Sequence, residues 1–364
     1  MTTKNYVVGI DIGGTNTALG LVDEEGGIIF TDSFVTNTFA EDIDAYVAEL
    51  AKRIRLAIQQ TSLAGQVCGV GVGVPNGNYF DGTVGFAVNL PWRQQVPLAK
   101  MLSDRINLPV TLNNDANAAT IGEMIYGAAR GMRNFIVITL GTGLGSGIVV
   151  DGNLIYGSNG YAGELGHIIV ERDGRLCGCG RHGCLETYVS ATGVARTARI
   201  YLSKYHTQPS SLRDLDPRNI TSKEVFLAAK SGDPIATQVF EDTGALLGRA
   251  LANFVHFSAP EAIVLFGGLT KAGNILMEPT RKAFRENLLS IYDVKLLTSL
   301  LREGDAAILG AAAIAWEKLR QTRMQAACTC TPEKESTQAP NPPRTASAET
   351  EAPRRTARSA RHPA

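Results

Sequence analysis

Residues 6–30 read YVVGIDIGGTNTALGLVDEEGGIIF, and residues 135–157 read FIVITLGTGLGSGIVVDGNLIYG. In both stretches, short apolar runs are separated by a glycine-rich turn and then by an acidic, glycine-containing turn, which predicts strands joined by hairpins. A shift of 128 residues places Ile10 on Ile138, Asp11 on Thr139, Gly13 on Gly141 and Asp23 on Asp151. We interpret the repeat as a duplicated domain. A chance likeness between two hairpins is the alternative.

The composition agrees with two α/β domains in one chain. The chain has 364 residues, which is more than one hydrophobic core usually supports. Acidic and basic residues balance at 35 each, so charge gives no argument for a nucleic-acid or membrane partner. The N-terminus lacks a signal-peptide pattern and no apolar run is long enough to cross a bilayer. We therefore expect a cytoplasmic protein, in which thiols stay reduced.

The rest of the chain alternates between helical and extended patterns. Apolar periodicity predicts a helix over 42–61, strands over 68–75 and 109–112, a helix beginning near 113, mostly helical structure over 190–257, a strand and glycine turn within 261–273, and a last helix over 305–320. From residue 321 the chain is rich in Pro, Ala, Ser, Thr and Arg, with almost no large apolar residue. Because such a segment buries too little surface to offset its chain entropy, we predict a disordered tail over 321–364.

Three glycine turns follow predicted strands, at residues 13–15, 141–145 and 267–269. Glycine lets backbone N–H groups approach a phosphate closely. The sequence contains no GxxxxGK[ST] motif, so it is not a P-loop protein. A dinucleotide-binding turn would require a helix after GTGLGSG, but the next residues, IVVDG, predict a strand and a turn. The turns therefore indicate a phosphate-binding site of another kind.

A cysteine cluster lies in HIIVERDGRLCGCGRHGCLE, residues 167–186. Cys177, Cys179 and Cys184 form a C-x-C-x₄-C pattern, and His167 adds an imidazole. Four nitrogen and sulfur ligands are typical of a structural tetrahedral Zn²⁺ site. A redox pair would need CxxC, which is absent from the cluster, and a disulfide is disfavoured in a reducing compartment. His182 is the alternative imidazole. Cys328 and Cys330 have no further ligands nearby in the sequence.

Asp115 follows a predicted strand and begins a predicted helix. A carboxylate there could cap the helix, or it could accept a proton from a substrate hydroxyl in a phosphoryl transfer. The sequence pattern by itself leaves both roles open.

The motifs DIGGT (11–15), GTGLG (141–145) and FGG (266–268) resemble the ATPase core shared by sugar kinases, actin and heat-shock chaperones. With the cysteine cluster, the chain resembles the ROK family (repressors, open reading frames and kinases) over about residues 6–320. The resemblance implies two actin-like (ribonuclease H-like, ASKHA) α/β domains with a nucleotide and sugar cleft between them. We expect the small domain at 1–115 plus 305–320, and the large domain, with the zinc knuckle, at 116–304.

The resemblance also implies roles for individual residues. It places Asp11 near Mg²⁺, and assigns ATP contacts to Gly13, Gly14, Thr15, Gly141, Thr142, Gly143, Gly267 and Gly268. Burying an unpaired carboxylate at the end of an apolar strand costs free energy. This cost favours a metal-binding role for Asp11 over the alternative of a buried turn carboxylate.

The family's NDAN motif matches residues 114–117, and the resemblance makes Asp115 the catalytic base. The sugar contacts implied are Asn89, Asn114, Asp115, Glu164, His167 and Glu186. A turn role before Pro91 is the alternative for Asn89. All four zinc ligands match the family pattern.

We therefore expect an ATP-dependent hexokinase that phosphorylates the 6-hydroxyl of glucose. Kinases for N-acetylglucosamine, N-acetylmannosamine, mannose and fructose share the motifs and remain alternatives. Pro75-Asn76-Gly77 departs from the family's Pro-Gly and leaves the fine specificity open. A sugar-responsive repressor would carry an N-terminal helix-turn-helix, for which the first strand near Tyr6 leaves no room. A non-catalytic sugar sensor is the third possibility. We expect a homodimer or homotetramer, as closed homo-oligomers are common.

Overall fold

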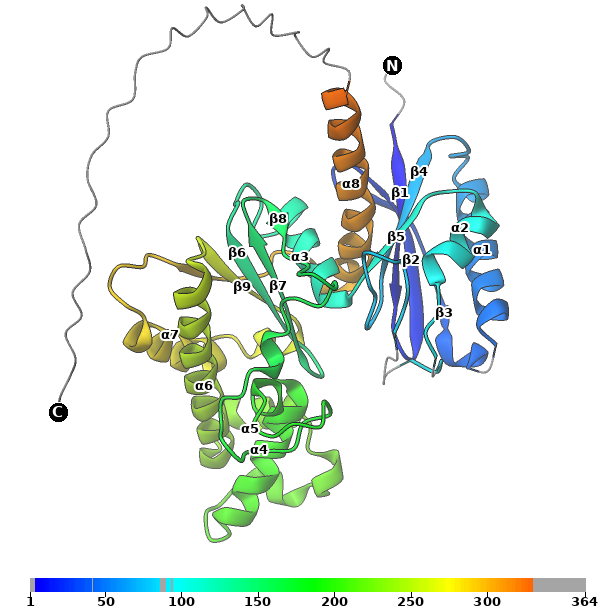
Figure 1. The fold of residues 1–364 in the computed structure, drawn as a ribbon. Helices are drawn as coiled ribbons and strands as arrows, with labels where there is room; N and C mark the ends of the chain where they lie inside the picture. Colours follow the sequence, from blue (N-terminus) through cyan, green and yellow to red (C-terminus); the bar gives the residue numbers. More distant parts are fainter. Residues whose placement is uncertain (1–3, 41, 86–89, 93, 330–364) are drawn as a thin grey trace, which may run out of the picture. The chain divides into compact units, whose positions relative to one another are not determined.

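Two five-stranded sheets form the centre of the protein (Figure 1). The computed structural model describes residues 4–40, 42–85, 90–92 and 94–329. The first sheet has the order β3-β2-β1-β4-β5, with β1 Tyr6–Ile12, β2 Asn16–Asp23, β3 Ile28–Val35, β4 Val67–Gly73 and β5 Val110–Asn113. The second has the order β10-β9-β6-β7-β8, with β6 Phe135–Leu140, β7 Leu144–Val150, β8 Asn153–Leu154, β9 Ala262–Phe266 and β10 Lys295–Thr298.

The two sheets share one plan. In the first, β1 pairs antiparallel with β2 and parallel with β4; in the second, β6 pairs antiparallel with β7 and parallel with β9. Asp11 lies opposite Ala18 near the end of the first hairpin, and Thr139 lies opposite Gly145 in the second. The layout that repeats in the sequence is therefore repeated in the topology, as a duplicated α/β fold predicts.

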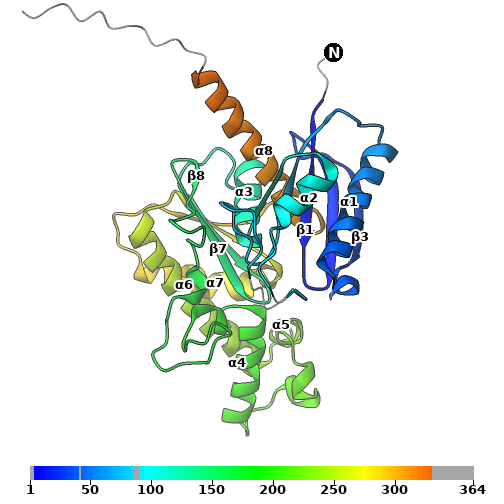
Figure 2. The ribbon, with the colours of Figure 1, turned by 45° about the vertical axis from the view of Figure 1, so that its right-hand side comes forward.

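Helices α1 (Ile43–Gln60) and α2 (Leu98–Ile106) cover one face of the first sheet (Figure 2). Asp42 caps α1, because its carboxylate accepts a hydrogen bond from the N–H of Ala45 at 2.8 Å. Val47, Leu50 and Ile54 of α1 are fully buried against the sheet. Burying side chains of this size contributes about 1.5–3 kcal/mol each. This sheet with α1 and α2 is the first lobe.

Helices α3 (Asp115–Ile125) and α8 (Glu303–Thr329) lie between the two sheets (Figure 1). On α8, Ile308 and Ala312 pack with Val7 of the first sheet. The next two residues, Ala313 and Ile314, lie on another face of the same helix and pack in the cluster that contains Phe135 of the second sheet. The small side chains predicted from the alanine-rich sequence let α8 contact both sheets closely. The assignment of 305–320 to the small domain stays a prediction.

The second lobe consists of the second sheet and four longer helices: α4 (Ala191–Lys204), α5 (Ser222–Lys230), α6 (Pro234–Ser258) and α7 (Asn274–Asn287). Asp233 caps α6 by accepting hydrogen bonds from the N–H groups of Ile235 and Ala236, both at 3.0 Å. Short 3₁₀ helices connect the elements: η1 (Thr36–Phe39), η2 (Leu165–His167), η3 (Leu185–Thr187), η4 (Ser211–Asp214), η5 (Pro217–Asn219) and η6 (Gly268–Ala272).

The end of the last helix differs from the prediction. Helix α8 continues to Thr329, so a disordered tail from 321 is wrong for its first residues, and 330–364 lie outside the described residues. The segment QTRMQAAC, 321–328, contains several good helix formers, and continuing an existing helix avoids the cost of nucleation. In the part of the chain that the structure describes, no helix has the length and apolar character needed to span a membrane.

Candidate active site

One cleft of about 510 Å³ brings together most of the predicted site residues. It is lined by Gly13, Gly14, Asn114, Asp115, Gly141, Thr142, Gly143, Glu164, Glu186 and Gly267. Four further candidates, Asp11, Thr15, His167 and Gly268, are not among its lining residues. Asn89 lies outside the described residues. The lining residues come from both sheets, as the duplicated fold requires for a cleft shared by the two lobes.

Each hairpin turn at the cleft is closed by a backbone hydrogen bond. The N–H of Gly13 donates to the carbonyl of Asn16 at 2.9 Å, and that of Gly141 donates to Gly143 at 3.0 Å. A larger residue would not fit at position 143 without a shift of its neighbours, because a Cβ on Gly143 would lie 2.8 Å from Oε2 of Glu186. Gly267 has φ of 108°, and a Cβ there would lie 2.7 Å from the carbonyl oxygen of Leu140. Because glycine has no side chain, the backbone N–H groups of these turns are accessible to a phosphate in the cleft.

The helix cap next to Asp115 is provided by Asn114. The side chain of Asn114 accepts a hydrogen bond from the N–H of Asn117 at 2.7 Å, and α3 begins at Asp115. Asp115 accepts a hydrogen bond from the N–H of Ala116, at 2.8 Å, and lines the cleft. The competing cap role therefore belongs to its neighbour, and the Asp115 carboxylate is available to a substrate. Protein atoms around it raise its pKa, mainly through desolvation.

Asp11 is the second-last residue of β1 and lies close to this helix start. Burial, and then the negative charge of Asp115, raise the pKa of Asp11 to about 6. Among the described residues no lysine or arginine pairs with either carboxylate. Two neighbouring acids without a cation are an unfavourable arrangement that a divalent metal ion would relieve. The oxygen donors fit the type that Mg²⁺ prefers.

Glu164 is held in the cleft by Ser146. The hydroxyl of Ser146 donates to the carbonyl of Gly163 and accepts from the N–H of Leu165 at 3.2 Å, so one side chain fixes both neighbours of Glu164. Desolvation raises the pKa of Glu164, and the charge of Asp115 adds to this rise. The sequence motif GTGLGS contains Ser146, but nothing in it indicates which loop the serine would hold.

The cysteine cluster forms behind the cleft. The donor atoms of His167, Cys177, Cys179 and Cys184 all lie within 4.8 Å of one another. The sulfur atoms of Cys179 and Cys184 are 3.6 Å apart, and Nδ1 of His167 is 3.6 Å from the sulfur of Cys177. Tetrahedral zinc with Zn–S bonds near 2.3 Å places its sulfur ligands about 3.7 Å apart. The set therefore fits a tetrahedral zinc ion, with Nδ1 rather than Nε2 of His167 turned toward the sulfur atoms.

Glu186 connects this cluster to the glycine turn. Its Oε1 accepts a hydrogen bond from the Cys177 thiol at 3.0 Å and lies 3.7 Å from Nδ1 of His167. Its Oε2 accepts from the N–H of Leu144 at 3.4 Å. On the other side of the ring, Nε2 of His167 lies 4.0 Å from Glu164. The imidazole thus lies between the two carboxylates that the resemblance assigns to the sugar.

Two positioning residues were not predicted. The buried Asn113 accepts hydrogen bonds from the N–H of Asn114, at 3.0 Å, and from the side chain of Asn117, at 2.9 Å. It also donates to the hydroxyl of Tyr156 at 3.1 Å, and the Tyr156 ring stacks on Tyr79 with centroids 4.3 Å apart. Asn113 lies in the NDAN region and could have been noticed there. Tyr156 is 43 residues away, and no local pattern links the two.

A duplicated α/β fold with glycine turns and a free carboxylate in one cleft defines an actin-like phosphotransferase core. The chain belongs to the ROK family, whose model matches residues 7–318. It is similar to a glucokinase of Thermotoga maritima, with 36% identity over 87% of this chain and 99% of that protein. A glucokinase of Streptomyces coelicolor is 38% identical over 76% of this chain and 86% of that protein.

Among solved structures, a ROK family glucokinase from Streptomyces griseus in complex with glucose and AMPPNP resembles this chain. It has a TM-score of 0.70 and 37% identity, and the match covers 86% of this chain and all of that one. The expected family and the actin-like fold class are therefore confirmed.

Proposed function

We propose that this protein is an ATP-dependent hexokinase that transfers a phosphoryl group to the 6-hydroxyl of glucose. The observation that carries the proposal is Asp115, a carboxylate that is free of the cap role and lines the same cleft as two glycine turns. The glucokinase relatives support the reaction and the sugar. Kinases for N-acetylglucosamine, N-acetylmannosamine, mannose or fructose are alternatives within the same chemistry.

In this proposal each part of the cleft has a separate task. The turns at 13–15 and 141–143, with Gly267 and Gly268, bind ATP. Asp11 is proposed to hold Mg²⁺, which when bound neutralises phosphate charge. Asp115 accepts the proton of the sugar hydroxyl, and its raised pKa brings it closer to the pH at which it must work. Asn89, Asn114, Glu164, His167 and Glu186 are proposed to bind the remaining hydroxyls.

Zinc is proposed as a structural ion bound by Nδ1 of His167 and the three thiolates. Its contribution is to fix a loop in which glycine alternates with cysteine, so that Glu186 and His167 keep their places at the cleft. Zinc takes no part in the transfer itself. Because these thiols must stay reduced to bind the metal, a cytoplasmic location is proposed as well. A homo-oligomeric assembly and the domain division at 115/116 and 304/305 complete the proposal.

The sugar specificity is tested by ADP release with Mg-ATP across glucose, mannose, fructose, N-acetylglucosamine and N-acetylmannosamine. We expect the highest kcat/KM for glucose. One extra methylene in a pocket typically changes specificity about 10–200-fold, so an N-acetyl sugar, which adds a larger group, should be poorer by at least about tenfold. A higher kcat/KM on an N-acetyl sugar would show that the proposed mechanism holds but that glucose is not the preferred substrate. Binding of sugar without turnover of any would indicate a sensor instead.

Activity should depend on pH through Asp11. With its pKa raised to about 6, Asp11 is largely protonated below that pH, so the rate should rise as the pH increases through about 6. A proton and Mg²⁺ compete for the same carboxylate, and tenfold more Mg²⁺ should move the acid limb down by up to about one pH unit. Measuring kcat/KM for ATP against pH at two Mg²⁺ concentrations tests this. If the low-pH side of the profile does not shift with the Mg²⁺ concentration, a group other than Asp11 controls the pH dependence.

A further inference from the structure

One stretch of the second lobe is held between two parts of the first lobe. Residues 156–160 follow β8 of the second sheet, whereas residues 78–80 follow β4 of the first sheet and Asn113 ends β5. The ring of Tyr156 stacks on the ring of Tyr79, with centroids 4.3 Å apart and 13° between the planes. The hydroxyl of Tyr156 accepts a hydrogen bond from the side chain of Asn113 at 3.1 Å. These three segments, 78–80, 113 and 156–160, form a joint between the lobes.

A second contact closes the joint beside the two rings. The side chain of Asn78 donates a hydrogen bond to the carbonyl of Asn159 at 3.0 Å, and Asn78 is buried. Gly160 has φ of 87°, and a Cβ there would lie 2.9 Å from Oδ1 of Asn78. The two lobes therefore approach so closely at this point that a larger residue at position 160 would push them apart.

Helix α8 holds one ring of the joint in place. The ammonium group of Lys318 lies 5.3 Å from the centroid of the Tyr79 ring and donates to the Tyr79 hydroxyl at 3.4 Å. The same hydroxyl donates to the side-chain oxygen of Gln321 at 3.3 Å. The helix that packs against both sheets thus also orients Tyr79, and it does so partly through a residue beyond position 320, where the last helix was expected to end.

Asn113 connects the joint to Asp115. Its side-chain oxygen accepts from the N–H of Asn114 and from the side chain of Asn117, so one amide holds residues on both sides of Asp115. Asn113 is fully buried, and its amide nitrogen donates to Tyr156. An amide has its donors on one side and its acceptor on the other, so the Tyr156 hydroxyl fixes which way the oxygen points. The second lobe thereby supports the first turn of α3.

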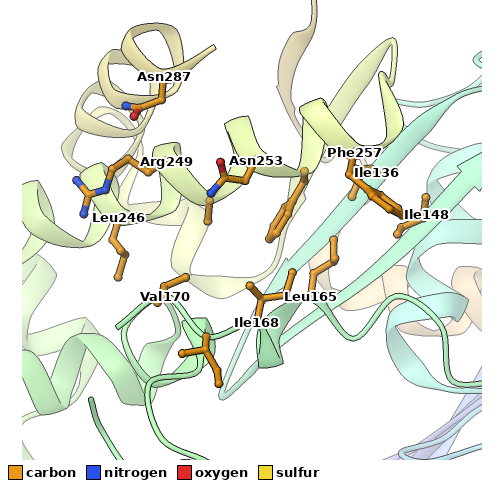
Figure 3. Close-up of a pocket in the computed structure, with 13 residues that line it drawn as sticks. Ile136, Ile148, Leu165, Ile168, Val170, Leu246, Arg249, Asn253, Phe257 and Asn287 are labelled. Carbon is orange, nitrogen blue, oxygen red and sulfur yellow. The ribbon is translucent and has the colours of Figure 1, made fainter. Parts of the chain in front are cut away.

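The joint is also connected to Glu164. The segment that begins at Tyr156 reaches Glu164 eight residues later. It then continues as one wall of an apolar hollow of about 530 Å³, where Leu165 and Ile168 lie opposite α6 (Figure 3). Leu165 packs against the core of the second lobe. Glu164 is therefore held between the joint on one side and the core of the second lobe on the other.

We propose that Tyr156 couples the placement of the two lobes to the placement of the catalytic base. Glu164 follows the joint on the second lobe, Asp115 follows β5 of the first lobe, and both line the cleft. Tyr156 is linked to Glu164 by a short segment of chain and to Asp115 through Asn113. It does not itself line the cleft, so it is a positioning residue. The proposal rests on the proposed function, in which Asp115 is the base.

The first test is Tyr156→Phe, which removes the hydroxyl and keeps the stacked ring. Because a displacement of about 1 Å can lower a rate about 100-fold, we expect kcat with glucose to fall about tenfold or more. The KM for ATP should stay within about twofold, since the phosphate-binding turns are not part of the joint. Tyr201→Phe is the matched control: it also removes a hydrogen-bonded hydroxyl, which contacts Asp242, but it lies on α4 and lines no part of the cleft. A Tyr156→Phe protein with the wild-type kcat would overturn the proposal.

A double-mutant cycle with Asp115→Asn tests the route. If Tyr156 acts through Asp115, both substitutions remove the same contribution, so Tyr156→Phe should lower kcat by less than about twofold in the Asp115→Asn background. A full further loss in that background would show that Tyr156 acts independently of the base and would overturn the proposal. Wild-type turnover by Asp115→Asn alone would contradict the proposed base and this route with it. An impaired Asp115→Asn beside an unimpaired Tyr156→Phe would contradict the role of the joint alone.

Two substitutions of Tyr79 test the part played by the stacked rings. Tyr79→Ala removes the ring on which Tyr156 packs, and we expect it to lower kcat by about fivefold or more. Tyr79→Phe keeps the ring and should restore kcat to within about twofold of the wild type. Equal losses in the two variants would assign the effect to the contacts of the Tyr79 hydroxyl with α8 and would refute a coupling through the stack. Circular dichroism and melting temperature verify that each variant is folded.

Discussion

Replacing Asp115 with Asn should lower kcat by about 10²–10⁴, which is the usual contribution of a positioned general base. The loss corresponds to about 3–5 kcal/mol of transition-state stabilisation. The change preserves size and the hydrogen bond from the N–H of Ala116, so the start of α3 should stay intact. Because the cap is Asn114, the variant should melt within a few degrees of the wild type. Glucose binding, measured by calorimetry, should persist.

Asp151→Asn is the matched control for this substitution. Asp151 occupies a turn at φ of 52°, a conformation that asparagine also tolerates, and its side chain is 74% exposed. The same chemical change there should leave kcat unchanged. If Asp115→Asn keeps kcat within about threefold, proton transfer to Asp115 does not limit turnover. If it unfolds instead, Asp115 has a structural role at the helix start, and the base must be sought elsewhere in the cleft.

The central architecture could be predicted because the deciding features are local. Strand β1 begins at Tyr6, where the sequence places the first strand, and the glycine turns follow strands as expected. Elements with weaker signals were missed. Strand β10 is four residues long and is defined by its pairing with β9, which the sequence does not reveal. Helix α2 is short and ends at Asn107 in the left-handed conformation, a C-cap signal that is less common than glycine.

The sequence predicted which residues form the site better than it predicted how those residues contact one another. The sequence could not separate a base from a cap at Asp115, because both roles place a short acid at the start of a helix. The structure distinguishes them through one contact, from the N–H of Asn117 to Asn114. The support that Ser146 gives to Glu164, and that Tyr156 gives to Asn113, crosses between chain segments that are 17 to 43 residues apart. Such contacts follow from the tertiary fold and have no short-range pattern.

The duplicated sheets differ at one edge, and this difference makes room for the loop that carries the cysteine cluster. Strand β3 of the first sheet has eight residues, but β8, its counterpart, has two. After β8 the chain leaves the sheet and forms the loop that carries Glu164, His167 and the three cysteines. This loop has no counterpart in the first lobe, and its segment 171–184 contains no regular strand or helix. A long irregular loop needs other contacts to hold it, and a metal ion supplies four.

Loss of zinc should therefore raise the KM for glucose before it unfolds the protein. Cys179→Ser is the most direct variant, because Cys179 is exposed whereas Cys177 and Cys184 are buried. We expect it to lose bound zinc and to raise the glucose KM by about 10–100-fold, while the KM for ATP changes less. Cys68→Ser is the matched control: Cys68 is a free thiol in β4, far from the cluster in sequence, and its variant should keep zinc and activity. Metal content is measured by mass spectrometry and KM by ADP release. A zinc-free Cys179→Ser with an unchanged glucose KM would show that the metal stabilises the loop without positioning Glu186 and His167, and a wild type that contains no zinc would refute the metal site.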